Sequence, residues 1–241
     1  MKTQFQLLSF LTLLLFGCET KRLFDDSTIA EEIIAEVNGS SGNIYFTEDK
    51  MAKNDSKKFF VELNVNRSEM IHKHNTERYL VASYCAAQLY KRLDQATIEK
   101  NYGFNIIFDN EEDMLNPKKY FFEKSELKQA IKAFDNIDKY LSFISTGDFL
   151  NASSLIDTSY FFLNVNELNR SVKNKIDQQI IRAFHFYKHF EYENKAGTKK
   201  TPCFAIGTII TRKDSSQTTI EFLTPIYEAS NKIINLDTHE K

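Results

Sequence analysis

Hydrophobic and polar positions recur along this chain with two periods, one typical of helices and one typical of strands. Between residues 27 and 37 apolar residues return every three or four positions, and Asn38 and Gly39 follow as a helix stop. The segment KKFFVELNVN at 57–66 alternates with period two, which predicts a strand with one buried face. The predicted buried side carries Phe59, Val61, Leu63 and Val65. An apolar run at 44–46 precedes this segment, so we expect two paired strands.

The clearest helical pattern of the first half spans residues 76–95. Its apolar residues cover a broad arc and include small alanines, which predicts a helix that lies flat on a sheet. Two further strand patterns follow at 102–110 and 118–124. The first half is therefore predicted to run helix, two strands, helix, two strands.

The second half begins with a long amphipathic pattern at 125–147, which ends at a glycine. Asp148 is placed to cap a short helix at 148–157, and a third helical pattern covers 166–180. Four strand patterns joined by polar segments follow, at 182–193, 202–213, 218–228 and 232–237. Helices followed by an antiparallel sheet indicate an α+β fold.

Strand periodicity gives way to a long helical pattern near residues 123–125, and we place a module boundary there. The predicted organisation is a signal segment at 1–17, a tether at 18–26, an N-terminal α+β module at 27–124 and a C-terminal α+β module at 125–241. The tether is inferred from a polar, charged composition without periodicity.

Period two in the 182–193 segment predicts which side chains share a face of the C-terminal sheet. If Phe184, Phe186 and Phe190 point at the helices, their neighbours point away from them. The predicted outward set includes His185, Tyr187, His189, Ile209 and Glu221. Such a mixture without heavy charge is typical of an interface core, and a homodimer is one predicted use. A solvated sheet face explains the same residues equally well.

Composition narrows the class of partner. The chain has 31 basic and 33 acidic residues and a net charge of -2, so no strong positive field for nucleic acid is expected. With 42% hydrophobic and 13% aromatic residues, it can build large cores. Cys85 falls in a helical pattern and Cys203 in a strand of the other half, so two separately buried thiols are expected in preference to a disulfide.

The N-terminus carries a targeting signal. Lys2 is followed by the apolar run FQLLSFLTLLLFG, which fits a signal peptide and is too short for a membrane-spanning helix. The residues LFGC at 15–18 resemble the lipobox of bacterial lipoproteins. The resemblance implies cleavage before Cys18, a diacylglycerol on its thiol and acylation of the new amino terminus. A plain secretory signal with an incidental Cys18 is the alternative.

The residues after this cysteine bear on location. Glu19, because it is not aspartate, resembles the residue that follows the cysteine in lipoproteins sent to the outer membrane. The acidic segment FDDS at 24–27 resembles a surface-export signal of Bacteroidota lipoproteins. The resemblance implies an outer-membrane or cell-surface location, with attachment through acyl chains. Which face of the membrane the protein occupies stays open.

The stretch STGDFLNASSLID at 145–157, followed by a run of long strands, carries a second resemblance. With it, residues 126–237 resemble the NTF2-like superfamily, in which three helices pack into a strongly curved sheet. The resemblance implies a cone-shaped pocket to which Tyr140, Asp157 and Tyr160 would contribute polar groups. Some members of the superfamily are isomerases or hydrolases, and in many the outer sheet face joins two subunits.

Motifs for chemistry are missing from the sequence. There is no GxSxG or SxxK pattern and no Gly-rich phosphate loop. His185 and His189 would lie about 13 Å apart on a strand, too far to share a metal ion. We therefore predict no catalytic residue, metal site or cofactor. The predicted function is a cell-envelope lipoprotein that binds a protein partner or a small ligand without catalysis. An NTF2-like enzyme and a structural envelope component are the alternatives.

Overall fold

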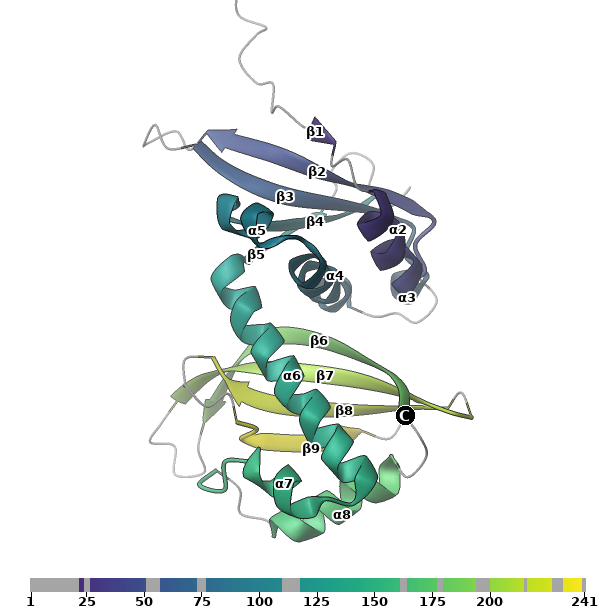
Figure 1. Ribbon diagram of the computed structural model, residues 1–241, viewed down its shortest axis with the longest axis vertical. Coiled ribbons are helices and arrows are strands. Elements are labelled where there is room, and N and C mark those ends of the chain that lie inside the picture. Colours follow the sequence, from purple (N-terminus) through teal and green to yellow (C-terminus); the bar gives the residue numbers. More distant parts are fainter. Residues whose placement is uncertain are drawn as a thin grey trace, which may run out of the picture.

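Two β-sheets follow one another along the long axis of the molecule, and helix α4 (Arg78–Arg92) lies between them (Figure 1). The computed structural model describes residues 22–23, 27–50, 57–72, 77–109, 118–160, 164–176, 180–193, 200–214, 216–226 and 232–239. Both halves combine helices with a sheet, which confirms the predicted α+β class.

The N-terminal sheet has the strand order β1-β2-β3-β4-β5. Its strands are β1 (Arg22–Leu23), β2 (Ser41–Lys50), β3 (Lys57–Asn66), β4 (Gly103–Asp109) and β5 (Lys118–Glu123). The β3 and β4 strands run parallel, since the chain crosses over through α4 between them, and the other neighbours are antiparallel. Helices α2 (Ser27–Glu36) and α4 pack on its inner face. The predicted order of helices and strands is found from residue 27 onward, with two unpredicted short helices, α3 (Glu69–His72) and α5 (Gln95–Lys100). The short strand β1 was also not predicted, because it lies within the segment 18–26 that was expected to be a tether.

The C-terminal half begins with three helices, α6 (Lys124–Thr146), α7 (Phe149–Ser154) and α8 (Val165–Lys175). The predicted local signals are confirmed: Gly147 ends α6 with a φ of 78°, and Asp148 caps α7 by accepting a hydrogen bond from Asn151 N–H. An antiparallel sheet follows in the order of its strands, β6 (Ile180–Glu193), β7 (Lys200–Arg212), β8 (Gln217–Pro225) and β9 (Asn235–His239). Helix α6 crosses one face of this sheet, and α7 and α8 pack at the C-terminal end of α6, below β9 in Figure 1.

Helix α4 also covers the edge of the C-terminal sheet, at strand β6. The backbone N–H of Tyr187 donates to Ser83 Oγ of α4 at 3.0 Å. The ring of Tyr84 packs against Phe184 and Phe186 at centroid distances of 5.2 and 5.8 Å. A sheet edge that would otherwise offer free backbone groups is thereby closed by a helix of the other half.

One hydrophobic core runs through both halves. Buried residues of the N-terminal sheet, α4, α6 and the C-terminal sheet belong to a single connected cluster. The predicted module boundary coincides with the junction of β5 and α6. Independent folding of the two modules stays a prediction. A test of it has to ask whether each module stays folded without the part of the core that the other module contributes.

The two cysteines that the structure describes are both buried and free, which confirms the predicted separate thiols. Cys85 lies in α4, where burial, with a contribution from the carboxylate of Glu36, raises its pKa well above the usual value. Cys203 lies in β7 and is fully buried. Since the thiolate is the reactive form, a buried neutral thiol is a poor nucleophile.

Candidate functional site

The histidines of β6 point toward α6, which overturns one prediction. His185 and Tyr187 are 6% and 0% exposed. His185 Nε2 lies 2.9 Å from Asp138 Oδ1, and His189 Nε2 lies 3.0 Å from Glu126 Oε1, with both acids on α6. The prediction that His185, Tyr187 and His189 face outward is therefore wrong. Both sides of β6 are packed, one against α6 and the other against Tyr84 of α4, so the alternation of its residues did not reveal which side faces α6.

Asp138, His185 and Thr208 form a chain of hydrogen bonds from α6 to β7. The two imidazole nitrogens each lie 2.9 Å from their oxygen partners. The order carboxylate, imidazole, hydroxyl is that of a hydrolytic triad. However, Thr208 is 0% exposed, and a nucleophile has to reach its substrate. Because Phe134 also stacks on the imidazole at 5.1 Å, the chain is a buried polar support that holds α6 on the sheet.

Two tyrosines face the acidic first turns of α6. Burial and the nearby carboxylate of Glu126 raise the pKa of Tyr79 to about 12. The same causes, with burial the larger, raise the pKa of Tyr187 well above its usual value. Both phenols are therefore neutral at physiological pH. Since Phe122 and Phe204 pack against the ring of Tyr187, this group belongs to the core.

The three residues predicted to line a pocket lie apart. Tyr140 is fully buried, and its ring packs against Phe222 on the helix side of the C-terminal sheet. Its hydroxyl donates to an asparagine of α8, and burial raises its pKa. Tyr160 instead packs in a small cluster with Cys203 on the opposite side of the sheet. Asp157 accepts hydrogen bonds within its own turn. The structure therefore does not bring these three side chains together.

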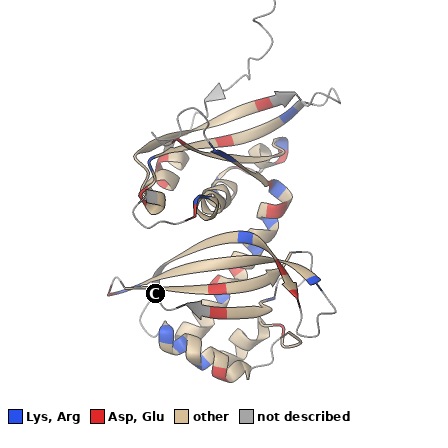
Figure 2. Ribbon diagram, turned by 180° about the vertical axis from the view of Figure 1, so that it is seen from behind, with Lys and Arg blue, Asp and Glu red and all other residues tan. Residues whose placement is uncertain are grey.

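Ile209 and Glu221 do lie on the outer face of the C-terminal sheet. They share that face with Gly207, which stands opposite Glu221 in the register of β7 and β8. Figure 2 shows no described helix over this face. A methyl group added at Gly207 would meet no atom within 4 Å, so the surface is open there. A homodimer contact at Ile209 and Glu221 stays a prediction.

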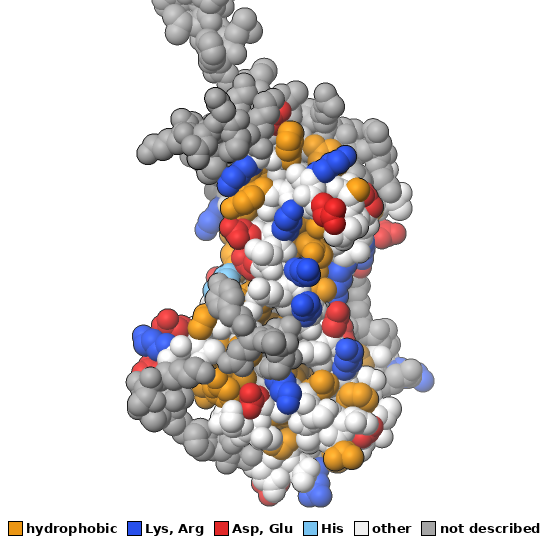
Figure 3. Space-filling model, turned by 60° about the vertical axis from the view of Figure 1, so that its left-hand side comes forward, with side chains coloured by type: hydrophobic (Ala, Val, Ile, Leu, Met, Phe, Trp, Pro, Cys, Tyr) orange, Lys and Arg blue, Asp and Glu red, His pale blue; other side chains and the backbone are white. Residues whose placement is uncertain are grey.

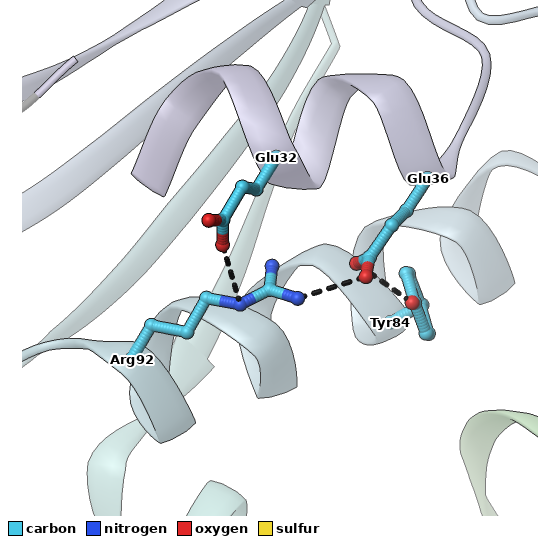
Figure 4. A network of polar contacts seen from close by, with 4 residues as sticks. All are labelled: Glu32, Glu36, Tyr84 and Arg92. Atoms are coloured by element: carbon cyan, nitrogen blue, oxygen red, sulfur yellow. Dashed lines mark hydrogen bonds and ion pairs between the residues drawn. The ribbon is translucent and has the colours of Figure 1, made fainter. Parts of the chain in front are cut away.

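A polar network joins α2 to α4 (Figure 4). Arg92 Nη2 donates to Glu36 Oε1 at 2.8 Å, and Arg92 Nε lies 3.5 Å from Glu32 Oε2. The hydroxyl of Tyr84 donates to the other oxygen of Glu36 at 2.8 Å. These contacts brace the helix pair and link it to Tyr84, which packs on β6.

A surface that the sequence analysis missed lies on the outer face of the N-terminal sheet. It consists of Phe60, Tyr102 and Phe121, whose ring centroids lie 5.8 to 5.9 Å apart, and we refer to it as the aromatic surface. Tyr102 and Phe121 are 39% and 42% exposed. The ammonium group of Lys58 lies 3.6 Å from the centre of the Tyr102 ring, as in a cation–π contact. In Figure 3, hydrophobic and basic side chains lie intermixed on the N-terminal part of the molecule.

The aromatic surface is held by close packing beneath it. A Cβ added at Gly103 would lie 2.5 Å from a ring carbon of Phe121, so this ring rests directly on the glycine backbone. On the same sheet face, Glu62 is 1% exposed and lies 3.3 Å from Lys119 Nζ. Exposed rings gathered on a rigid sheet face are typical of an interaction surface.

The sequence did contain a signal for this surface, in two pairs of adjacent phenylalanines. Neighbouring residues of a strand point to opposite faces, so each pair places one ring outside the core. In β5, Phe122 is fully buried whereas Phe121 is exposed. In β3, Phe60 joins the aromatic surface. Phe59 was predicted on the buried side, but it lies near the start of the strand and is 44% exposed.

The described ranges contain neither a metal-binding cluster nor a membrane-spanning helix. No group of three or more His, Cys, Asp or Glu side chains in these ranges is placed to hold a metal ion. None of the helices in the same ranges is long and apolar enough to cross a membrane. Cys18, the predicted lipidation site, lies outside the described residues.

Comparisons with known proteins add no relatives. No protein-family model, no curated protein and no solved structure matches this chain.

Proposed function

We propose that the protein is a lipoprotein of the bacterial cell envelope, acylated on Cys18, that acts as a non-catalytic interaction module at the outer membrane or the cell surface. The observation that carries this proposal is that the first described strand, β1, begins only a few residues after Cys18 and pairs with the N-terminal sheet. Arg22 and Leu23, shortly after the lipobox-like LFGC at 15–18, pair with Phe46 and Tyr45 of β2. Lipid on Cys18 would therefore hold the N-terminal sheet close to a membrane.

We assign the binding role of this interaction module to the aromatic surface. Tyr102 and Phe121 expose ring surface, and Phe121 is supported from below by the backbone of Gly103. The two histidines of β6 are both paired with acids of α6, but only His185 is buried, since the side chain of His189 is 53% exposed. Groups that are already paired and buried favour a structural role, and exposed aromatic groups favour binding. These contrasts support an interaction module in preference to an enzyme.

We further propose that the C-terminal half is NTF2-like. The succession of α6, the Asp148-capped α7, α8 and a four-stranded antiparallel sheet supports this relation. An NTF2-like enzyme is the second candidate function, because the half-exposed carboxylate of Asp138 already contacts an imidazole.

Lipidation is tested with Cys18→Ser in the full chain, produced in a bacterium that acylates lipoproteins. We expect the variant to lose incorporation of labelled palmitate and to leave the membrane fraction, while Cys203→Ser, a matched control at a buried thiol, keeps both. Sedimentation of the Cys18→Ser protein with membranes after a high-salt wash would contradict the proposal.

A further inference from the structure

We infer that the aromatic surface is a membrane-contact surface, and that it lies on the headgroup region of the same bilayer that holds Cys18. The inference rests on the proposed lipidation and deepens it, since it names what the exposed rings of this sheet face contact. Three features of the molecule carry it: the length of the tether, the direction of the face and the chemistry of its side chains.

The link between Cys18 and the first residue of β1 is too short to hold the N-terminal sheet far from the lipid. Position 18 precedes β1 by four residues, and a fully extended chain of that length spans about 14 Å. The β1 strand pairs with the middle of β2, so the sheet edge itself is held within that distance. A lipid surface is thereby the nearest partner that the N-terminal sheet would meet.

The outer face of the N-terminal sheet points away from the rest of the molecule. Its inner face packs on α2 and α4, and α4 separates it from the C-terminal sheet (Figure 1). The register places Leu23, Tyr45, Glu62, Asn105 and Phe121 in one row across the five strands. Four strand spacings amount to about 19 Å, so a sheet lying flat brings both the tether and Phe121 to the bilayer.

The side chains of this face suit a membrane interface. Tyr102 and Phe121 expose ring surface, and Tyr102 also keeps its hydroxyl in a hydrogen bond to Glu123 at 3.1 Å. Tyrosine at the level of the headgroups combines an apolar ring with a polar tip in this way. Lys58, over the Tyr102 ring, offers a cation to lipid phosphates while its stem stays against apolar surface.

Tryptophan fluorescence tests this contact, because the chain contains no tryptophan. Phe121→Trp introduces a single fluorophore whose ring still covers Gly103. Leu150→Trp, on α7 at a side chain that is 84% exposed, is the matched control. Both full-length lipidated variants are reconstituted into vesicles of phosphatidylethanolamine and phosphatidylglycerol, with and without brominated acyl chains.

We expect the emission of Phe121→Trp to shift to shorter wavelength on anchoring and to be quenched severalfold more by brominated lipid than that of Leu150→Trp. Adding Lys58→Glu should reduce this quenching without releasing the protein. Equal and weak quenching at both sites in protein that still sediments with vesicles would overturn the membrane contact and leave lipidation intact. Such a result would direct attention to a protein partner on the same face.

Lipidation is judged separately, by sedimentation of the same samples. Wild-type protein that does not sediment with the vesicles would overturn the proposed anchor. If Phe121→Trp were nevertheless quenched on addition of these vesicles, the membrane contact would stand without the anchor.

Discussion

The two sheets bury their inner faces in the same way but differ at their edges and outer faces. Each has helices on one side, α2 and α4 for the first and α6 for the second. The N-terminal sheet exposes rings on its outer face, whereas the C-terminal sheet has an open surface at Gly207. In the second sheet, the edge strand β6 is closed by helix α4 of the other half. Helix α4 therefore packs on the inner face of the N-terminal sheet and on the edge strand of the C-terminal sheet.

This arrangement explains why a single core continues through the molecule. A helix that packs only on its own sheet would leave its far side to solvent. The far side of α4 carries Ser83 and Tyr84, which contact β6 by a hydrogen bond and by ring packing. Ser83, Tyr84 and Phe186 in this contact are 0%, 4% and 3% exposed, and such burial of aromatic side chains is typical of permanent interfaces.

The largest effect is expected from breaking this contact. Phe186→Ala removes a ring that is 3% exposed and packs on Tyr84, and should lower the free energy of unfolding by about 3 to 5 kcal/mol. Since the core is shared, denaturant melts followed by far-UV and near-UV circular dichroism should shift together in one transition.

The matched control is Phe190→Ala on the same strand. Its ring is 45% exposed, so the change should stay within about 0.5 kcal/mol. Two resolved transitions in Phe186→Ala, with only one displaced, would instead support the predicted independent modules on either side of position 124.

The outer faces are compared by adding one methyl group to each. Gly103→Ala forces a Cβ to within 2.6 Å of the backbone oxygen of Phe122, and should cost about 1 to 3 kcal/mol. Gly207→Ala meets open space and should be neutral or stabilise by up to about 1 kcal/mol, because alanine restricts the unfolded chain. Thermal denaturation of both variants shows whether each substitution lowers or raises the stability of the protein. A loss at Gly207 as large as that at Gly103 would contradict the described difference between the faces.

Local signals allowed much of the fold to be predicted. The stop at Asn38, the left-handed Gly147 and the cap at Asp148 depend only on neighbours in sequence, and each is found where predicted. The buried face of β3 was also predicted correctly at Val61 and Leu63. The opposite face carries the polar Glu62 and Asn64 beside Phe60, so its pattern marks it as the side that stays out of the core.

Strand β6 could not be oriented in this way. Period two separates its residues into two sets, but both sets are packed, so hydrophobicity does not tell them apart. The polar member that marks the helix side is His185, and its burial is made acceptable by Asp138, 47 positions away in the sequence. Partners at that separation are set by the tertiary fold and leave no local pattern.

The smallest effect on the free energy of unfolding is expected at the contact between Asp138 and His185, which fixes the side of β6 that faces α6. Burial raises the pKa of Asp138, but the hydrogen bond to His185 and the positive charges of His185 and Lys91 outweigh it and hold the pKa below the usual 3.8. A lowered carboxyl pKa stabilises the fold above the unfolded value, and this contribution is lost as the pH falls through the folded pKa.

Asp138→Asn should therefore lower the free energy of unfolding by about 1 kcal/mol or less at neutral pH, since the carboxylate is half exposed. The difference from wild type should vanish as the pH falls below about 4. Urea melts across this pH range measure it, with Asp135→Asn as control, because that exposed carboxylate lies 3.9 Å from Lys91 and contributes little to stability. A difference that persists unchanged in acid would show that the charge of Asp138 does not matter, and that only its shape and hydrogen bond hold α6 against β6.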